Sequence, residues 1–387
     1  MAVPFAIAYL LACPLLIRNS RIASVYSDRA IFMICSSISE YEHKRICLYR
    51  HFSYLLIDMV RLSVKKVLLI VVCLVIIGTS LALLMQQPES QGPVRVVMGP
   101  FFAHYILCYP LEHEFVKPTI GVEIEKTLNF NEHLMAGGGD MGEMSTAAFA
   151  IAYHKGIPLK TVRIFVSHHG LERGEGVARV FARNESDVHR PEDLVGKKVG
   201  VPGLKTTTTT IFLEMLKRKY GIEEEELELI AKASPMLPTL LDMGDIDAAL
   251  MLGDVSVKSY YSNKYKEVWN VDEAFKQEYG EYPPASLLVV NADFFEKHKD
   301  RAEDAIDTLI QSKAYGEEHI DEICEWYADK FGGDADYYKK AYYNHYAIFL
   351  TPITDENRGA VMTIFEFTKD RGIITEVPDP ADAFVSI

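Results

Sequence analysis

From residue 94 to residue 291, short runs rich in apolar residues alternate with longer amphipathic stretches. The short runs have the two-residue period of strands and the longer stretches have the period of helices. The pattern predicts β-α-β-α-β-α-β up to residue 167 and a second α/β series from 176 to 269, which indicates two open α/β sheets. The remaining chain is predicted as a strand at 286–291 and helices at 293–298, 301–331, 335–349 and 355–370.

The segment 190–216 is the most informative part of the second series. It predicts a short helix at Pro191–Leu194, a strand at Lys198–Val201, a glycine loop and then a helix. Thr206, Thr207 and Thr208 lie where helix caps occur, and a threonine hydroxyl there accepts from free N–H groups of the first turn. Such a helix start attracts anions, so it is a candidate ligand platform. The alternative is an ordinary strand–helix connection with a threonine cap.

A continuous apolar run at 67–85 is long enough to cross a bilayer. Arg61, Lys65 and Lys66 precede it, which predicts that everything after residue 86 lies outside the cytoplasm. The run is either an uncleaved anchor or a signal segment, with a linker up to residue 93. We interpret residues 1–58 as an N-terminal extension translated from an upstream start that the cell does not use; the alternative is a second membrane segment at residues 2–17.

Charge is spread unevenly along the 387 residues. The net charge is −14, with +4 on residues 1–93 and −18 on the remainder. This acidic remainder argues against a nucleic-acid partner. The sequence contains no CxxC motif and no cluster with metal-ligand spacing, so we expect neither a metal nor a cofactor. Cys108 and Cys324 are expected to be buried free thiols.

Four segments occur in an order and spacing that resembles one family. They are AGGGDMG (136–142), AYHKGIPLKTV (152–162), RPEDLVGKKVGVP (190–202) and LLDMGDIDAALM (240–251). Over about residues 94–300 the chain is similar to the solute-binding proteins of ABC importers for nitrate, sulfonate, taurine and thiamine-pyrimidine precursors. The resemblance implies a two-lobed type II periplasmic-binding-protein fold, a small-molecule ligand between hinged lobes, and partner permease and ATPase subunits. Lobe I would comprise 94–175 and 280–387, and lobe II 176–279.

Ligand contacts are expected in the turns that follow the strands, because open α/β sheets bind there. Glu143 departs from the small residues common in the family's second loop, and its carboxylate favours a ligand that also carries an amine, as taurine does. Nitrate, bicarbonate or a pyrimidine precursor are the alternative ligands. The candidate residues are Gly99, Pro100, Phe101, Met141, Glu143, Met144, Ser145, His168, Thr206, Thr207, Thr208, Leu252 and Asp254.

Several candidates also have simpler explanations. Glu143 is typical of a surface charge or helix cap, Asp254 of an N-cap, and His168 of a solvated or core histidine. Phe102 joins Phe101 as a candidate cleft aromatic, whereas the tyrosines at 338, 342 and 346 fit one packed helical face. Enzymes of thiamine-pyrimidine and menaquinone biosynthesis share the fold, but no nucleophile–base pair is visible, so we expect a binding protein rather than an enzyme.

Overall fold

The computed structural model describes residues 92–167, 169, 176–345 and 347–385. The predicted apolar run at 67–85, the extension at 1–58 and His168 lie outside these residues. Within them, no helix combines the length and the apolar character needed to span a membrane.

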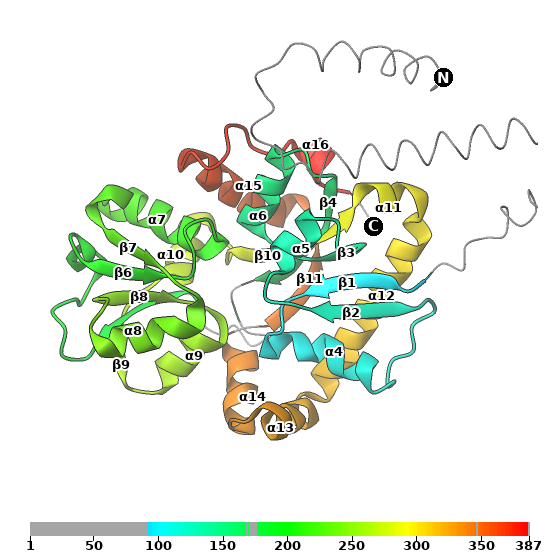
Figure 1. Cartoon of the computed structure of the whole chain (residues 1–387), viewed down its shortest axis with the longest axis horizontal. Helices are drawn as coiled ribbons and strands as arrows, with labels where there is room; N and C mark the ends of the chain where they lie inside the picture. The colour runs from blue at the N-terminus through cyan, green and yellow to red at the C-terminus, as the bar shows by residue number, and fades with distance from the viewer. Residues whose placement is uncertain (1–91, 168, 170–175, 346, 386–387) are drawn as a thin grey trace, which may run out of the picture. The chain divides into compact units, whose positions relative to one another are not determined.

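The first lobe is built on a six-stranded sheet with the order β11-β4-β10-β3-β1-β2 (Figure 1). β1, β2 and β3 are parallel, whereas β10 is antiparallel to β3 and β4, and β11 is antiparallel to β4. The strands are β1 (Val94–Met98), β2 (Val122–Lys126), β3 (Met141–Ser145), β4 (Leu159–Ser167), β10 (Pro284–Asn291) and β11 (Ala347–Pro352).

Helices cover both faces of this sheet. One buried cluster joins β1 to α4, α12, α13 and α14, and another joins β3 and β4 to α5, α6 and α15. The helical segments are η1 (Phe102–His104), α4 (Tyr105–Glu112), α5 (Phe130–Met135), α6 (Thr146–His154), α11 (Ala292–Lys297), α12 (Lys299–Glu318), α13 (Ile320–Phe331), α14 (Ala335–Asn344), α15 (Asp355–Asp370) and α16 (Pro380–Ala383).

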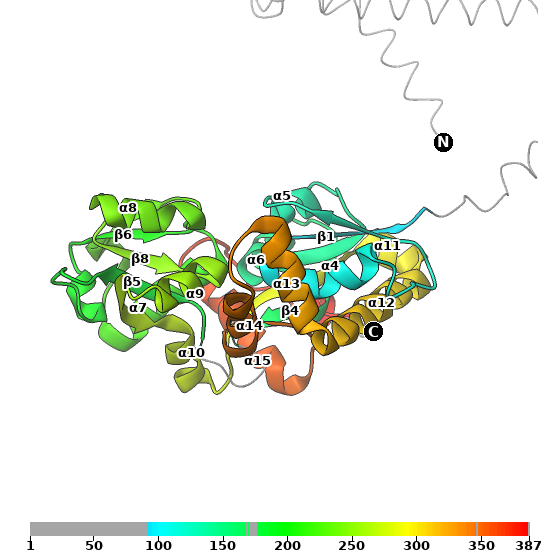
Figure 2. The same ribbon diagram turned by 90° about the horizontal axis from the view of Figure 1, so that it is seen from below.

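The second lobe is built on a five-stranded sheet with the order β7-β6-β8-β5-β9. Its strands are β5 (Arg179–Arg183), β6 (Lys198–Val201), β7 (Glu228–Ala231), β8 (Ala248–Met251) and β9 (Tyr265–Asn270). α7 and α10 pack on one face, and α8 and α9 lie on the other (Figures 1 and 2). The helical segments are η2 (Pro191–Leu194), α7 (Thr207–Tyr220), η3 (Glu224–Glu226), η4 (Ser234–Met236), α8 (Leu237–Met243), α9 (Gly253–Tyr261) and α10 (Val271–Tyr279). The two predicted α/β sheets are therefore confirmed.

Three predicted elements need correction. The segment Met141–Ser145 is not a loop but the strand β3, which pairs with β1 on one side and β10 on the other. The helix expected at 335–349 ends at Asn344, and residues 347–352 instead form the edge strand β11. The single helix expected at 301–331 breaks at His319 into α12 and α13. α10 and α16 were not predicted.

The last long helix, α15, contacts both lobes. Its Val361 and Phe365 belong to the cluster with Phe149 of α6 in the first lobe. Its Ile364 and Phe367 belong to the cluster built on α7 and the second sheet. An amphipathic helix with two apolar faces buries both, so α15 bridges the two lobes by packing.

Candidate functional site

The turns that follow four strands, two from each sheet, meet at two hydrogen bonds between the lobes. The N–H of Ala147, in the first turn of α6, donates to Thr207 Oγ1 over 2.9 Å. The N–H of Phe102, in the turn after β1, donates to Asp254 Oδ2 over 3.4 Å. These contacts join the turns after β1, β3, β6 and β8, which are four of the turns in which ligand contacts were expected.

The start of α7 is capped as predicted. Thr206 is the N-cap residue, and its Oγ1 accepts from the N–H of Thr209 over 3.2 Å. Thr207 and Thr208 are buried, with 3% and 4% of their surface exposed. Because the hydroxyl of Thr207 reaches α6, the first turn of α7 faces the first lobe rather than solvent.

Glu143 is neither a surface charge nor a helix cap, because it is buried in β3 at the centre of a polar cluster. Its Oε2 lies 2.7 Å from His104 Nε2 and accepts from the N–H of Gly99 over 3.1 Å. Its Oε1 accepts from Ser286 Oγ over 2.9 Å. Burial by itself would raise the pKa of Glu143, but His104 and the two other donors hold that pKa below its usual value. Through these bonds, the cluster holds the turn that follows β1 against the strand β3.

Asp254 lies at the start of α9 with tyrosines around it. Besides the contact to Phe102, its backbone oxygen accepts from Tyr337 Oη over 3.1 Å. Loss of solvation raises the pKa of the Asp254 carboxyl, and the N–H of Phe102 and nearby His104 offset this only in part. Burial also raises the pKa of Tyr337, of Tyr327 and of Tyr338, with Asp254 adding to each shift. A partly desolvated carboxylate among aromatic rings suits a cationic group.

The apolar candidates are distributed differently. The Phe101 ring is half-buried, 5.3 Å from the His104 ring and 6.4 Å from the Phe130 ring. Phe102 is fully buried against Tyr327 and Tyr338, so it is a core aromatic rather than a cleft aromatic.

Two further candidates, Met141 and Met144, are fully buried in β3, in the clusters on opposite faces of the sheet. Their contact with a ligand stays a prediction. The remaining candidates lie at element boundaries: Pro100 precedes η1, Ser145 is the N-cap of α6, and Leu252 is the N-cap of α9.

Sequence reasoning did not identify His104, Ser286 or Tyr337. A histidine inside the apolar run FFAHYILCYP was the available signal for His104, since an isolated polar residue in such a run needs a partner. Ser286 and Tyr337 carry no local signal.

Within the described ranges, no group of three or more His, Cys, Asp or Glu side chains is placed to hold a metal ion. Cys108 and Cys324 are buried and unpaired, as predicted, and burial raises the pKa of each thiol to about 12.

Comparisons with known proteins agree with the two-lobed fold. Residues 101–370 match the model of a family described as menaquinone biosynthesis. The taurine-binding periplasmic protein of Escherichia coli strain K12 is 25% identical over 167 residues, which cover 43% of this chain and 48% of that protein. The chain thus spans about half the length of the curated relative it matches.

Solved structures show the fold. The aliphatic sulphonate binding protein SsuA from Escherichia coli aligns with a TM-score of 0.62 and 12% identity, covering 76% of this chain and 92% of that one. Protein AF1704 from Archaeoglobus fulgidus aligns with a TM-score of 0.59 and 19% identity, covering 74% of this chain and 100% of that one. The periplasmic-binding-protein fold expected from the four motifs is confirmed. Since the family model spans most of the described residues, the chain belongs to the menaquinone biosynthesis family.

Proposed function

We propose that the chain is an extracytoplasmic solute-binding protein that captures a small organic anion or zwitterion between its lobes and delivers it to an ABC permease and ATPase. The observation that carries this proposal is the meeting of four strand-end turns from two separate sheets at Thr207–Ala147 and Asp254–Phe102. Ligands of open α/β folds bind beyond strand ends, and two lobes that meet there can close on one.

The ligand class follows from the charged and polar groups beside these two hydrogen bonds. The first turns of α6 and α7 offer backbone N–H groups and the positive ends of two helix dipoles, which favour an acidic group. Asp254, with Tyr337 beside it, offers a carboxylate and an aromatic ring, which favour an ammonium group. A taurine-like zwitterion satisfies both ends, and the taurine-binding relative supports this class.

Calorimetry on the full chain with taurine, ethanesulfonate, nitrate, bicarbonate and a pyrimidine tests the proposal. We expect taurine to bind most tightly. Asp254→Asn keeps an oxygen for the N–H of Phe102 and removes the charge, so it should weaken taurine at least about tenfold, the loss of one charge-assisted contact. Ethanesulfonate lacks the ammonium group, so its affinity should hardly change. Equal effects on both ligands would contradict the assignment of Asp254, and no binding by any of them would contradict the proposed function.

An enzyme is the second candidate, because the family description names a biosynthetic route. His104 and Glu143 form a buried histidine–carboxylate pair next to the turn after β1, which is the arrangement of an oriented general base. The protein is incubated with its ligand, and the bound molecule is then identified by mass spectrometry, which distinguishes capture from turnover. Recovery of an altered ligand, abolished by His104→Gln, would establish turnover, whereas recovery of unchanged ligand supports capture.

A further inference from the structure

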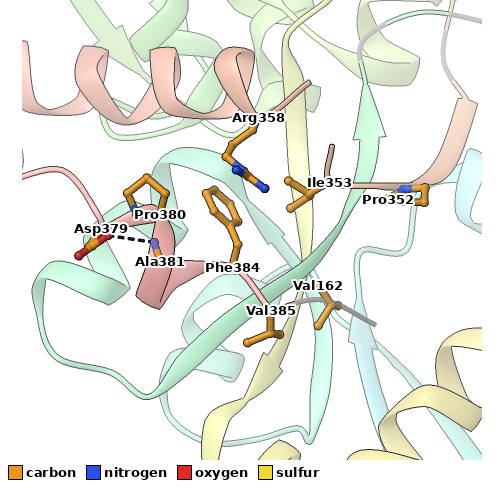
Figure 3. A pocket seen from close by; sticks show the side chains of 9 residues that line it. All are labelled: Val162, Pro352, Ile353, Arg358, Asp379, Pro380, Ala381, Phe384 and Val385. Atoms are coloured by element: carbon orange, nitrogen blue, oxygen red, sulfur yellow. Dashed lines mark hydrogen bonds between the residues drawn. The ribbon is translucent and has the colours of Figure 1, made fainter. Parts of the chain in front are cut away.

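A pocket lies in the first lobe, away from the contacts between the lobes. It has a volume of about 690 Å³ and is formed by β4, the segment that follows β11, the first turns of α15 and the segment around α16 (Figure 3). None of the predicted ligand contacts lines it. Pockets of roughly 300–1,000 Å³ hold small organic molecules, so the size fits a ligand. Its lining residues are Val162, Pro352, Ile353, Arg358, Asp379, Pro380, Ala381, Phe384 and Val385.

Arg358 is the cationic group of this pocket. Figure 3 shows its guanidinium between Ile353 and the Phe384 ring, whose centroid is 5.8 Å away. Its Nη1 pairs with Asp355 over 2.9 Å, and that carboxylate is 94% exposed, so the pair contributes little. Its Nε is buried and has no hydrogen-bond partner within the described residues. Nε and Nη2 form one edge of the planar group, which is the edge that binds both oxygens of a carboxylate.

The unpaired Nε points to a missing acceptor. Buried N–H groups nearly always have a partner, so each exception needs an explanation. The Arg358 side chain is 39% exposed, which leaves it free to turn its Nε–Nη2 edge toward the pocket. A carboxylate in the pocket would satisfy both N–H groups of that edge at once.

The other walls restrict the class of ligand. Val162, Ile353, Phe384 and Val385 are apolar, so the body of the ligand should be apolar or aromatic. Asp379 accepts from the N–H of Ala381 over 2.9 Å and places a carboxylate at the wall, which disfavours a second anionic group on the ligand. We propose that this pocket is a second small-molecule site, which binds a monocarboxylate with an apolar or aromatic body through Arg358.

Titration of the full chain with benzoate, followed by ligand-observed NMR, tests the site. We expect measurable binding, weaker by about tenfold or more in Arg358→Gln, because a bidentate charge-assisted contact is lost. Benzamide, which has the same body without the charge, should bind the unaltered chain no better than benzoate binds Arg358→Gln. The matched control Arg190→Gln changes an exposed arginine of the second lobe and should leave benzoate binding unchanged.

Ala381→Phe provides an independent test, because it fills the pocket from an exposed position and leaves Arg358 in place. It should reduce benzoate affinity as strongly as Arg358→Gln does. Unchanged affinity in either folded variant would overturn the proposal, as would the absence of benzoate binding. Displacement of benzoate by taurine would also overturn it, because that result assigns benzoate to the contacts between the lobes.

Discussion

The hydroxyl of Thr207 accepts a hydrogen bond from the N–H of Ala147 over 2.9 Å, and the pair joins the first turns of α7 and α6. A first-turn N–H has no partner within its own helix and must find one elsewhere. Here a side chain of the opposite lobe supplies it. In the proposed function, the acidic group of the ligand would replace the Thr207 hydroxyl at this amide, so the contact between lobes and the binding of ligand would compete.

Thr207→Val tests this contact, because valine keeps the shape of threonine and removes the acceptor. The buried N–H of Ala147 would then be unpaired, which should lower the free energy of unfolding by about 1–3 kcal/mol. Urea denaturation measures the change. Thr208→Val is the matched control, since Thr208 is equally buried and makes no side-chain hydrogen bond among the described residues. A similar loss in both variants would show that packing, and not the Ala147 contact, is responsible.

The Glu143 cluster predicts a defined pH dependence of stability. Because the folded-state pKa of Glu143 is below its ordinary value of 4.5, its stabilising contribution is complete above that pH. The contribution is lost as the pH falls through the lower folded-state value. Glu143→Gln leaves His104 buried without a carboxylate, which should cost about 2–4 kcal/mol near pH 7, close to the cost of breaking a buried pair.

Denaturation of the unaltered chain and of Glu143→Gln between pH 3 and pH 7 measures this dependence. The difference between the two free energies of unfolding should be largest above about pH 4.5 and shrink below it. Glu123→Gln changes an exposed glutamate of β2 and should show no such difference. A difference between Glu143→Gln and the unaltered chain that is constant with pH would contradict the depressed pKa.

The fold was predictable wherever local pattern and tertiary pairing agree. β6 and α15 have the predicted bounds, because the apolar periodicity of β6 ends at a proline and that of α15 begins after a capping threonine. β3 lies where a turn at the end of the third strand was predicted, since the sequence MGEMS has the glycine and charge of a loop. It is a strand because Glu143 finds partners in His104 and Ser286, both distant in the sequence.

In the candidate site too, local features were predictable from the sequence and features that depend on the tertiary fold were not. The cap at Thr206 depends on residues three apart, and the sequence predicts it. The tyrosines near Asp254 come from α13 and α14, about eighty residues further along the chain, so only the tertiary fold brings them to the strand end. β11 shows the limit of periodicity, because its residues 347–349 lie within the helix predicted at 335–349, whereas the structure pairs β11 with β4.

Arg371 should determine the position of the loop that precedes α7. Its Nη2 pairs with Glu224 over 2.9 Å, and its Nη1 donates to the backbone oxygen of Leu204 over 2.8 Å and to Thr210 Oγ1 over 3.1 Å. The side chain is only 6% exposed, so Arg371→Ala should lower the free energy of unfolding by about 2–3 kcal/mol, the range for hydrogen bonds to a charged group.

Urea denaturation of Arg371→Ala measures this loss, with Lys217→Ala as the control. Lys217 of α7 pairs with Glu223, the residue before η3, over 2.9 Å, but both side chains are about half exposed, so the loss of this pair should cost much less than the loss of Arg371. Equal losses in the two variants would mean that Arg371 acts only as an ordinary surface ion pair.

Two helical glycines should respond oppositely to alanine. A Cβ on Gly316 of α12 would lie 2.2 Å from the backbone oxygen of Ile106 in α4, where neither helix can yield without separating the pair. Gly316→Ala should therefore cost about 2–3 kcal/mol or more, at the upper end for overpacking. Gly359 of α15 has open space around it, so Gly359→Ala should stabilise by about 0.5–1 kcal/mol through helix propensity. Thermal denaturation of both variants decides the point, because a stabilising effect of Gly316→Ala is incompatible with the close approach of α4 and α12.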